Sequence, residues 1–269
     1  MTLRRSISVA QTCPIKGDID RNVEAHVRLA DLAAGEGAQV VVFPELSLTG
    51  YEIGLAGRLA FGEDDARLSR LLDAAASRSI TMIVGAPVRL DGRLYLGAFV
   101  LCPDRTTALY TKHRLGAFGE SARLDGVVPP AEATVFAAGD RNPLVRLGDT
   151  TAAIAICADI GAPAHPQRAA DRGAAAYLAS MFVIPSDFDA DSGRLARYAA
   201  QHSMVVALAN YGCPTGGLAS AGRSAVWSPR GELIVQLPPG GGGVAVATET
   251  PDGWRSATVM LSDVRAASG

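Results

Sequence analysis

The chain has 269 residues, of which 48% are hydrophobic and 19% charged, and its formal net charge at pH 7 is −2. This composition supplies enough apolar side chains for a buried core, and it lacks the basic surplus of a nucleic-acid-binding protein. No apolar run reaches the roughly 18 residues that a membrane-spanning helix needs. We therefore expect one domain, residues 1–269, that binds neither nucleic acid nor membrane.

The cysteines and the N-terminal residues bear on the cellular compartment. Cys13, Cys102, Cys157 and Cys213 are scattered, with no C-x-x-C pair and no histidine at ligand spacing. This pattern favours neither a disulfide framework nor a zinc site. The first strand is not preceded by an apolar signal core. The sequence therefore predicts a soluble cytoplasmic protein without a bound metal.

The first part of the chain alternates short β-branched runs with amphipathic stretches. Asp18 or Asp20 is expected to cap the first helix, which ends near Gly35 or Gly37. Asp91-Gly92 is a hairpin signal between two strands. Strands are expected at residues 6–10, 40–43, 81–84, 95–101 and 107–111, and a second helix at residues 63–79.

Residues 116–130 form a long segment rich in glycine and proline, which is typical of a functional loop. After it, strands are expected at residues 133–136, 144–147, 152–156, 176–179, 205–209, 224–227, 233–236 and 244–248, of which the last ends the sheet. Helices are expected at residues 166–172 and 191–202. Each helix lies between strands, which predicts an α/β layered domain with helices covering the faces of the sheets.

Three polar residues each follow an expected strand: Glu45 after one proline, and Lys112 and Cys157 directly. Taken singly, such a cysteine is more often core filler and such a carboxylate more often solvated. If the strands lie side by side, however, the three side chains meet at one sheet edge, where α/β ligand sites lie. Lys112 would lower the pKa of the Cys157 thiol, and Glu45 would accept its proton. Lys112 and the backbone N–H of Ala158 would hold an oxyanion.

The motifs around these residues resemble those of the carbon–nitrogen hydrolases of the nitrilase superfamily. Residues 43–51 match the general-base motif of that family, residues 110–115 its lysine motif and residues 156–159 its nucleophile motif. Phe118-Gly119-Glu120 looks like the second glutamate that the family places beside the lysine, and residues 220–225 are similar to a later small-residue motif. The motifs follow the family's order and span most of the chain.

The resemblance implies a four-layer αββα sandwich, in which two mixed sheets face each other and the helices lie outside. It also implies that Glu45, Lys112 and Cys157 are catalytic, that Glu120 orients the lysine, and that no metal or organic cofactor is needed. Because family members commonly dimerise, we expect a homodimer or a higher homo-oligomer. The pocket walls are expected to come from Tyr51, Met181, Phe182, residues 116–130 and residues 211–222.

Two departures from the family pattern bear on the substrate. Nitrile-cleaving members typically show Cys-Trp-Glu, whereas this chain has Ala158 and Asp159 after the cysteine, and Ala164 stands where many members carry a glutamate. The expected function is therefore hydrolysis of a small linear carboxamide to an acid and ammonia through a thioester. An N-carbamoyl amine or amino acid amidohydrolase is the alternative and a nitrilase the third reading. A catalytically silent binding scaffold is the alternative that is not an enzyme.

Overall fold

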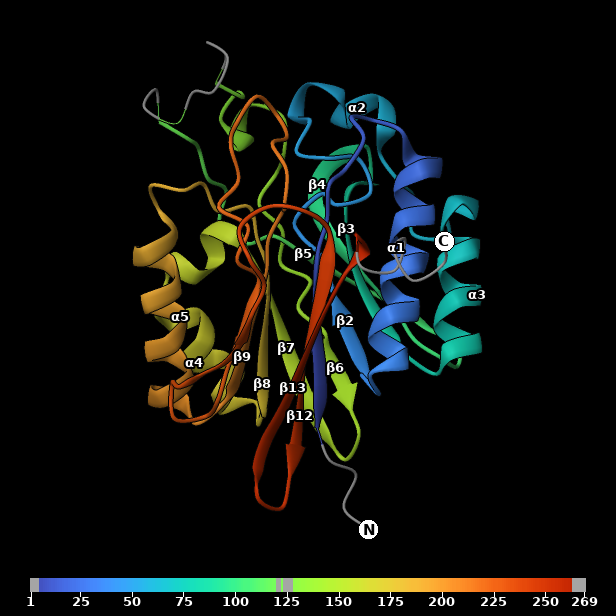
Figure 1. Cartoon of the computed structure of the whole chain (residues 1–269). Coiled ribbons are helices and arrows are strands. Elements are labelled where there is room, and N and C mark those ends of the chain that lie inside the picture. The colour runs from blue at the N-terminus through green and yellow to red at the C-terminus, as the bar shows by residue number, and fades with distance from the viewer. Residues whose placement is uncertain (1–4, 120–121, 123–127, 263–269) are drawn as a thin grey trace.

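The computed structural model describes residues 5–119, 122 and 128–262, and it shows two stacked sheets between two layers of helices (Figure 1). One sheet has the order β13 (Gly253–Met260), β12 (Gly243–Thr250), β1 (Ser6–Gln11), β2 (Val40–Val42), β3 (Thr81–Leu90), β4 (Arg93–Leu101) and β5 (Thr107–Thr111). The other has the order β11 (Leu233–Gln236), β10 (Ala225–Trp227), β9 (Val205–Ala209), β8 (Ala176–Ser180), β7 (Thr150–Ile156) and β6 (Leu144–Leu147). Both sheets mix parallel and antiparallel pairs. The predicted αββα sandwich is confirmed.

The helices lie on the outer faces of the sheets, as Figure 1 shows: α1 (Ile19–Gly35) and α3 (Ser69–Arg78) on one side, α4 (Ala164–Asp171) and α5 (Phe188–His202) on the other. The Asp18 side chain caps α1 by accepting a hydrogen bond from the Arg21 backbone N–H, as such side chains do for the unpaired amides of a first turn. A shorter helix, α2 (Ala56–Leu59), follows the 3₁₀ turn η1 (Ile53–Leu55), and η2 (Ala66–Leu68) leads into α3.

The core has three apolar layers because side chains alternate between the two faces of each strand. In β2, Val40 and Val42 point into the layer between the sheets, whereas Val41 points toward α1 and α3. A third layer lies between the second sheet and helices α4 and α5. The parallel strands of both sheets are therefore buried on both faces, which explains their continuous apolar runs.

Two expected elements differ from the structure. The last strand is β13, not the segment at residues 244–248, and it pairs with β12 from Gly243↔Met260 to Thr250↔Gly253. Each residue of this edge strand is exposed or half-buried, and polar residues interrupt the apolar ones, so the strand lacks the continuous apolar run that reveals buried strands. Residues 133–136 do not form the expected strand, because Glu132–Thr134 is the 3₁₀ turn η4.

The expectation of no disulfide is wrong, because Cys13 and Cys213 are bonded to each other across 200 positions of sequence. Their neighbours Thr12 and Tyr211 pair as a parallel bridge beyond the ends of β1 and β9, which brings the two cysteines together. Because disulfides are rare in the cytosol, the scattered cysteines give no support to a cytoplasmic location. Within the described ranges, none of the helices has the length and apolar character needed to cross a bilayer.

Candidate active site

Glu45 is held in a tight turn that follows β2. Its backbone N–H donates to the Met181 carbonyl at 3.4 Å, and the Tyr211 hydroxyl donates to the Glu45 carbonyl. The turn passes so close to β3 that a Cβ atom at Gly85 would lie 2.5 Å from the Leu46 nitrogen. Only glycine fits there. The carboxylate is 1% exposed, so the backbone fixes its position in the interior.

Lys112 follows β5 and lies between two carboxylates. Its Nζ donates to Glu45 Oε1 at 2.6 Å and to Glu132 Oε1 at 2.7 Å, and the three side chains are at most 1% exposed. Glu132 also accepts hydrogen bonds from the Tyr51 hydroxyl and from the Gly116 backbone N–H, each at 2.7 Å. One buried ammonium therefore connects the β2 turn with the segment that follows the long loop.

Glu132 is the functional residue that sequence reasoning missed. The resemblance to the family points to Glu120 as the second glutamate, but Glu120 lies outside the residues that the structure describes. Glu132 stands 20 positions after Lys112, in a Pro-Pro-Ala-Glu sequence without periodicity. The one feature of the sequence that points to Glu132 is its place just after the long loop at residues 116–130. That position does not tell which carboxylate contacts Lys112.

Cys157 directly follows β7 and opens the 3₁₀ turn η5 (Cys157–Gly161). Its φ is +41°, in a region that residues with a Cβ atom occupy only when the surroundings impose it. The thiol Sγ donates to the Phe182 carbonyl at 3.7 Å. The sharp turn directs the side chain away from the strand ladder and toward the cavity described below.

The electrostatics of the cluster differ from the expectation in one respect. Burial raises the pKa of the Cys157 thiol well above its usual value, the charge of Glu45 raises it further, and the charge of Lys112 only partly opposes them. Lys112 thus lowers the thiol pKa as expected, but it does not produce a resting thiolate. The nucleophile therefore needs a base.

Glu45 has the properties of that base. Burial raises the pKa of its carboxyl to about 8, although the Lys112 charge opposes this and Glu132 adds to it. Burial opposes the charge of Lys112, but the neighbouring carboxylates of Glu45 and Glu132 outweigh it and raise the pKa of the ammonium. Glu45 Oε2 is buried and accepts no hydrogen bond from the described residues. A carboxyl group with such a pKa exchanges a proton near neutral pH.

A cavity of about 160 Å³ opens onto the nucleophile, close in size to one of ~150 Å³ that holds benzene. Three aromatic rings form part of its wall, since Tyr51 contacts Phe118 and Phe182 with ring centroids 5.5 and 5.0 Å apart. The lining residues are Tyr51, Gly116, Ala117, Phe118, Gly119, Glu132, Cys157, Ala158, Phe182, Val183, Asp187 and Asp191. The cavity is thus small and narrow, with the thiol in its wall.

Of the expected wall residues, Tyr51, Phe182 and residues 116–119 line the cavity and Met181 does not. Ala158, whose backbone N–H was expected to hold the oxyanion, lines it as well. The Met181 side chain packs in the apolar layer beneath α5, because residues beyond β8 continue to alternate between faces. Tyr211 lies behind the wall, with its ring 5.2 Å from that of Phe182. The expected contribution of residues 211–222 is therefore indirect.

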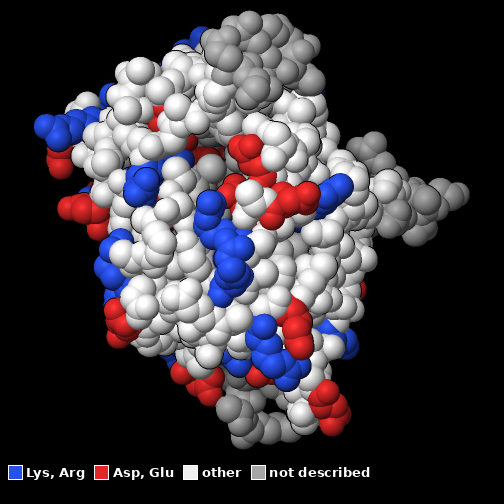
Figure 2. All heavy atoms as spheres, turned by 90° about the vertical axis from the view of Figure 1, so that its left-hand side faces the viewer, with Lys and Arg blue, Asp and Glu red and all other residues white. Residues whose placement is uncertain are grey.

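The described lining residues include three carboxylates, Glu132, Asp187 and Asp191, and no Lys, Arg or His. Asp191 forms an ion pair with Arg194 on the next turn of α5. Figure 2 shows acidic and basic side chains close together on the face that this helix covers. The cavity itself is therefore acidic, and the described part of the chain contains no cluster of side chains suited to hold a metal ion.

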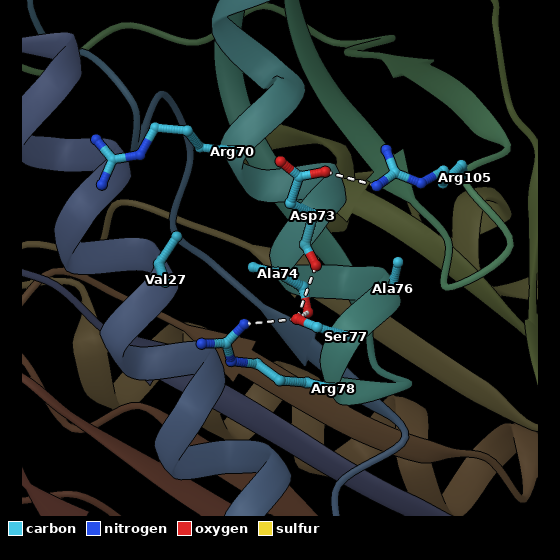
Figure 3. A pocket seen from close by; sticks show the side chains of 8 residues that line it. All are labelled: Val27, Arg70, Asp73, Ala74, Ala76, Ser77, Arg78 and Arg105. Atoms are coloured by element: carbon cyan, nitrogen blue, oxygen red, sulfur yellow. Dashed lines mark hydrogen bonds and ion pairs between the residues drawn. The ribbon is translucent and has the colours of Figure 1, made fainter.

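A second hollow, of about 660 Å³, lies on the outer surface at α1 and α3 (Figure 3). Two of its three arginines are engaged at the surface: Arg105 donates to Asp73 at 2.6 Å and Arg78 to Ser77 at 2.8 Å. The lining residues are Val27, Arg70, Asp73, Ala74, Ala76, Ser77, Arg78 and Arg105. None of these is a nucleophile beside a buried base, so we take the Cys157 cavity as the candidate active site.

Comparisons with known proteins agree with this geometry. The carbon-nitrogen hydrolase family model matches residues 6–258. A hydrolase encoded in the pqqF 5' region of Pseudomonas protegens is 31% identical over 202 residues, covering 73% of this chain and 67% of the relative. A glutamine-dependent NAD(+) synthetase of Thermotoga maritima is 25% identical over 65% of this chain, which spans only 29% of that protein.

The structure of an amidase from Nesterenkonia sp. AN1 superimposes with a TM-score of 0.79 and 25% identity, covering 92% of this chain and 93% of the amidase. A cysteine-to-alanine variant of the same amidase has been solved in complex with butyramide. The family match covers nearly the whole chain, and the solved amidase shares its architecture. The chain belongs to the carbon–nitrogen hydrolase family of the nitrilase superfamily and is a hydrolase of carbon–nitrogen bonds.

Proposed function

We propose that this hydrolase cleaves small, linear, uncharged carboxamides to an acid and ammonia through a thioester on Cys157. The observation that carries the proposal is the position of Lys112. Its ammonium lies between Glu45 and Glu132, at 2.6 and 2.7 Å, behind a small cavity that the thiol lines. A buried base, a fixed cation and a nucleophile in one cavity are the parts that acyl transfer requires.

The first half of the proposed reaction forms the thioester. Glu45 accepts the thiol proton as Cys157 Sγ attacks the amide carbon, and the carbonyl oxygen becomes an oxyanion. Lys112 and the backbone N–H of Ala158 stabilise that oxyanion, an interaction whose loss typically costs ~10²–10³-fold in rate. The leaving nitrogen takes the proton from Glu45, the C–N bond breaks, and ammonia departs.

The second half restores the enzyme. Glu45, again ionised, takes a proton from a water molecule that attacks the thioester carbon. The tetrahedral intermediate collapses, the C–S bond breaks, and the thiolate takes the proton back from Glu45 as the acid leaves. Glu132 holds Lys112 in place throughout through its hydrogen bonds to Nζ, Tyr51 and Gly116.

The cavity supports the size and charge of this substrate. Its volume of about 160 Å³ suits a short chain, and Phe118 and Phe182 offer apolar contact. Glu132 and Asp191 are paired with Lys112 and Arg194, which leaves Asp187 as the lining carboxylate without an ion pair among the described residues. Its charge would repel a substrate that carries its own carboxylate, which disfavours N-carbamoyl amino acids more than neutral N-carbamoyl amines. The butyramide bound by the Nesterenkonia relative is a linear amide of this kind. The homo-oligomeric assembly expected for the family remains part of this proposal.

Ammonia release from a substrate panel tests the proposal. The panel contains acetamide, propionamide, butyramide, a neutral N-carbamoyl amine, an N-carbamoyl amino acid and butyronitrile, each with the wild type and with Cys157→Ala. We expect release from the amides by the wild type alone. Release from the nitrile or the carbamoyl compounds but not from the amides would assign those activities instead. No release, combined with no rapidly alkylated cysteine, would favour the binding scaffold.

A further inference from the structure

We propose that Asp159 is a positioning residue that fixes the nucleophile turn against the lysine segment. The inference rests on the proposed roles of Cys157 and Lys112 and concerns how the fold sets the geometry between them. Cys157 follows β7 in one sheet and Lys112 follows β5 in the other, so no ladder of backbone hydrogen bonds joins the two segments. Some other contact has to set their separation.

The Asp159 carboxylate makes that contact with both of its oxygens. Oδ1 accepts hydrogen bonds from the backbone N–H groups of His113 at 3.1 Å and Arg114 at 2.8 Å. Oδ2 accepts from the backbone N–H of Ile156 at 3.0 Å and from the Tyr110 hydroxyl at 2.7 Å. The donors flank the two proposed catalytic residues: Tyr110 and His113 lie on either side of Lys112, and Ile156 immediately precedes Cys157.

Asp159 is buried, so its carboxylate depends on these hydrogen bonds. The residue is 0% exposed, and within the described ranges no Lys or Arg forms an ion pair with it. A buried carboxylate without a cation is tolerated only where hydrogen-bond donors replace the lost water. The same bonds restrain the turn in which Cys157 adopts a φ of +41°, a conformation that persists only when its surroundings determine it.

A chain of buried hydrogen bonds holds Asp159 from behind. Because a carboxylate only accepts, the Tyr110 hydroxyl proton points at Oδ2, and His165 Nε2 therefore donates to the Tyr110 oxygen at 2.9 Å. His165 Nδ1 is then the acceptor for the Tyr177 hydroxyl at 2.8 Å. Burial lowers the pKa of His165 to about 4, which keeps the ring neutral with one N–H, as this order requires.

Asp159→Asn tests the proposal, because an amide places an NH₂ group against at least one of the four donors. We expect kcat on butyramide to fall about 10²-fold, the scale of a misplacement near 1 Å, with KM within about threefold. The iodoacetamide alkylation rate of Cys157, mapped by peptide mass, should fall as well. The matched control is Ser6→Ala, which removes a buried hydroxyl that bonds to Thr248 at the start of β1 and takes no part in the hydrogen bonds around Asp159. Its melting temperature should fall, with kcat and alkylation within about twofold.

The proposal is overturned if folded Asp159→Asn keeps wild-type kcat and alkylation, or if Ser6→Ala lowers both as strongly. Should the asparagine variant not fold, Tyr110→Phe removes one of the four bonds. We expect it to lower kcat and alkylation about tenfold, and a lower melting temperature with unchanged kinetics would contradict us. The alkylation readout needs no substrate, so it decides on Asp159 even if the wild type releases no ammonia from amides.

Discussion

Removing the disulfide between Cys13 and Cys213 should cost the protein much of its conformational stability. The bond closes a loop of 200 positions, and the chain-entropy relation gives a stabilisation of about 5 kcal/mol for a loop of that length. This figure is an upper value, because residual structure in the unfolded chain reduces it. With a urea m-value of about 2.5 kcal/mol/M, the unfolding midpoint should fall by up to about 2 M.

The assay compares urea unfolding of the oxidised wild type with that of the Cys13→Ser/Cys213→Ser double variant, followed by tryptophan fluorescence and circular dichroism. Cys102→Ser is the matched control, because Cys102 is a free and partly buried cysteine. The unfolding midpoint of Cys102→Ser should stay close to that of the wild type. A reductant should lower the midpoints of the wild type and of Cys102→Ser, which keep the disulfide, but not that of the double variant.

The reasoning is refuted if the double variant unfolds at the wild-type midpoint. It is also refuted if thiol titration of the unfolded, unreduced wild type finds all four cysteines free. Loss of activity at urea concentrations below the unfolding midpoint would show that the disulfide also supports the Glu45 turn. Tyr211, two positions before Cys213, donates a hydrogen bond to the Glu45 carbonyl.

Three further predictions concern ionisable groups. Burial raises the pKa of the Glu45 carboxyl to about 8, and Glu45 is the proposed base. The value of kcat/KM should therefore rise with pH, with a midpoint near pH 8, and a pH-independent rate from pH 6 to 9 would contradict this. Glu132→Gln should lower kcat at least about tenfold, whereas Glu120→Gln should not, because Glu132 already pairs with Lys112. Equal losses in the two variants, or a larger loss in Glu120→Gln, would show that Glu132 is not the second glutamate of the site. Burial lowers the pKa of His26 to about 4. As the pH falls below about 6.5, this imidazole is protonated in the unfolded chain before it is protonated in the folded protein. The free energy of unfolding should therefore decrease by about 3 kcal/mol toward pH 4. A His26→Gln variant should lack this part of the pH dependence in urea unfolding, and an unchanged slope would refute it.

The buried architecture was predictable because burial on both faces leaves a continuous apolar run in the sequence. Val40–Val42 and Val205–Ala209 are strands of this kind, and both lie inside their sheets. Gly253–Met260 was missed because an exposed edge strand needs no such run. Pattern reading therefore found the centre of each sheet and failed at an edge.

The candidate site was predictable to the extent that it depends on strand ends. Glu45, Lys112 and Cys157 each follow a strand closely, as expected. Their strands do not lie side by side, because β2 and β5 are separated by β3 and β4 and β7 belongs to the other sheet, and the site forms where the two sheets face each other. Glu132 and the disulfide depend instead on contacts across 20 and 200 positions. Such contacts are set by the packing of the two sheets and leave no local periodicity.

Mass spectrometry of the enzyme quenched in acid during turnover of butyramide tests the proposed thioester most directly. We expect the wild-type mass to increase by one butyryl group, with the modification on the peptide that contains Cys157 and absent from Glu45→Gln and Cys157→Ala. Steady ammonia release without an acyl group on Cys157, or continued turnover by Cys157→Ala, would contradict the mechanism.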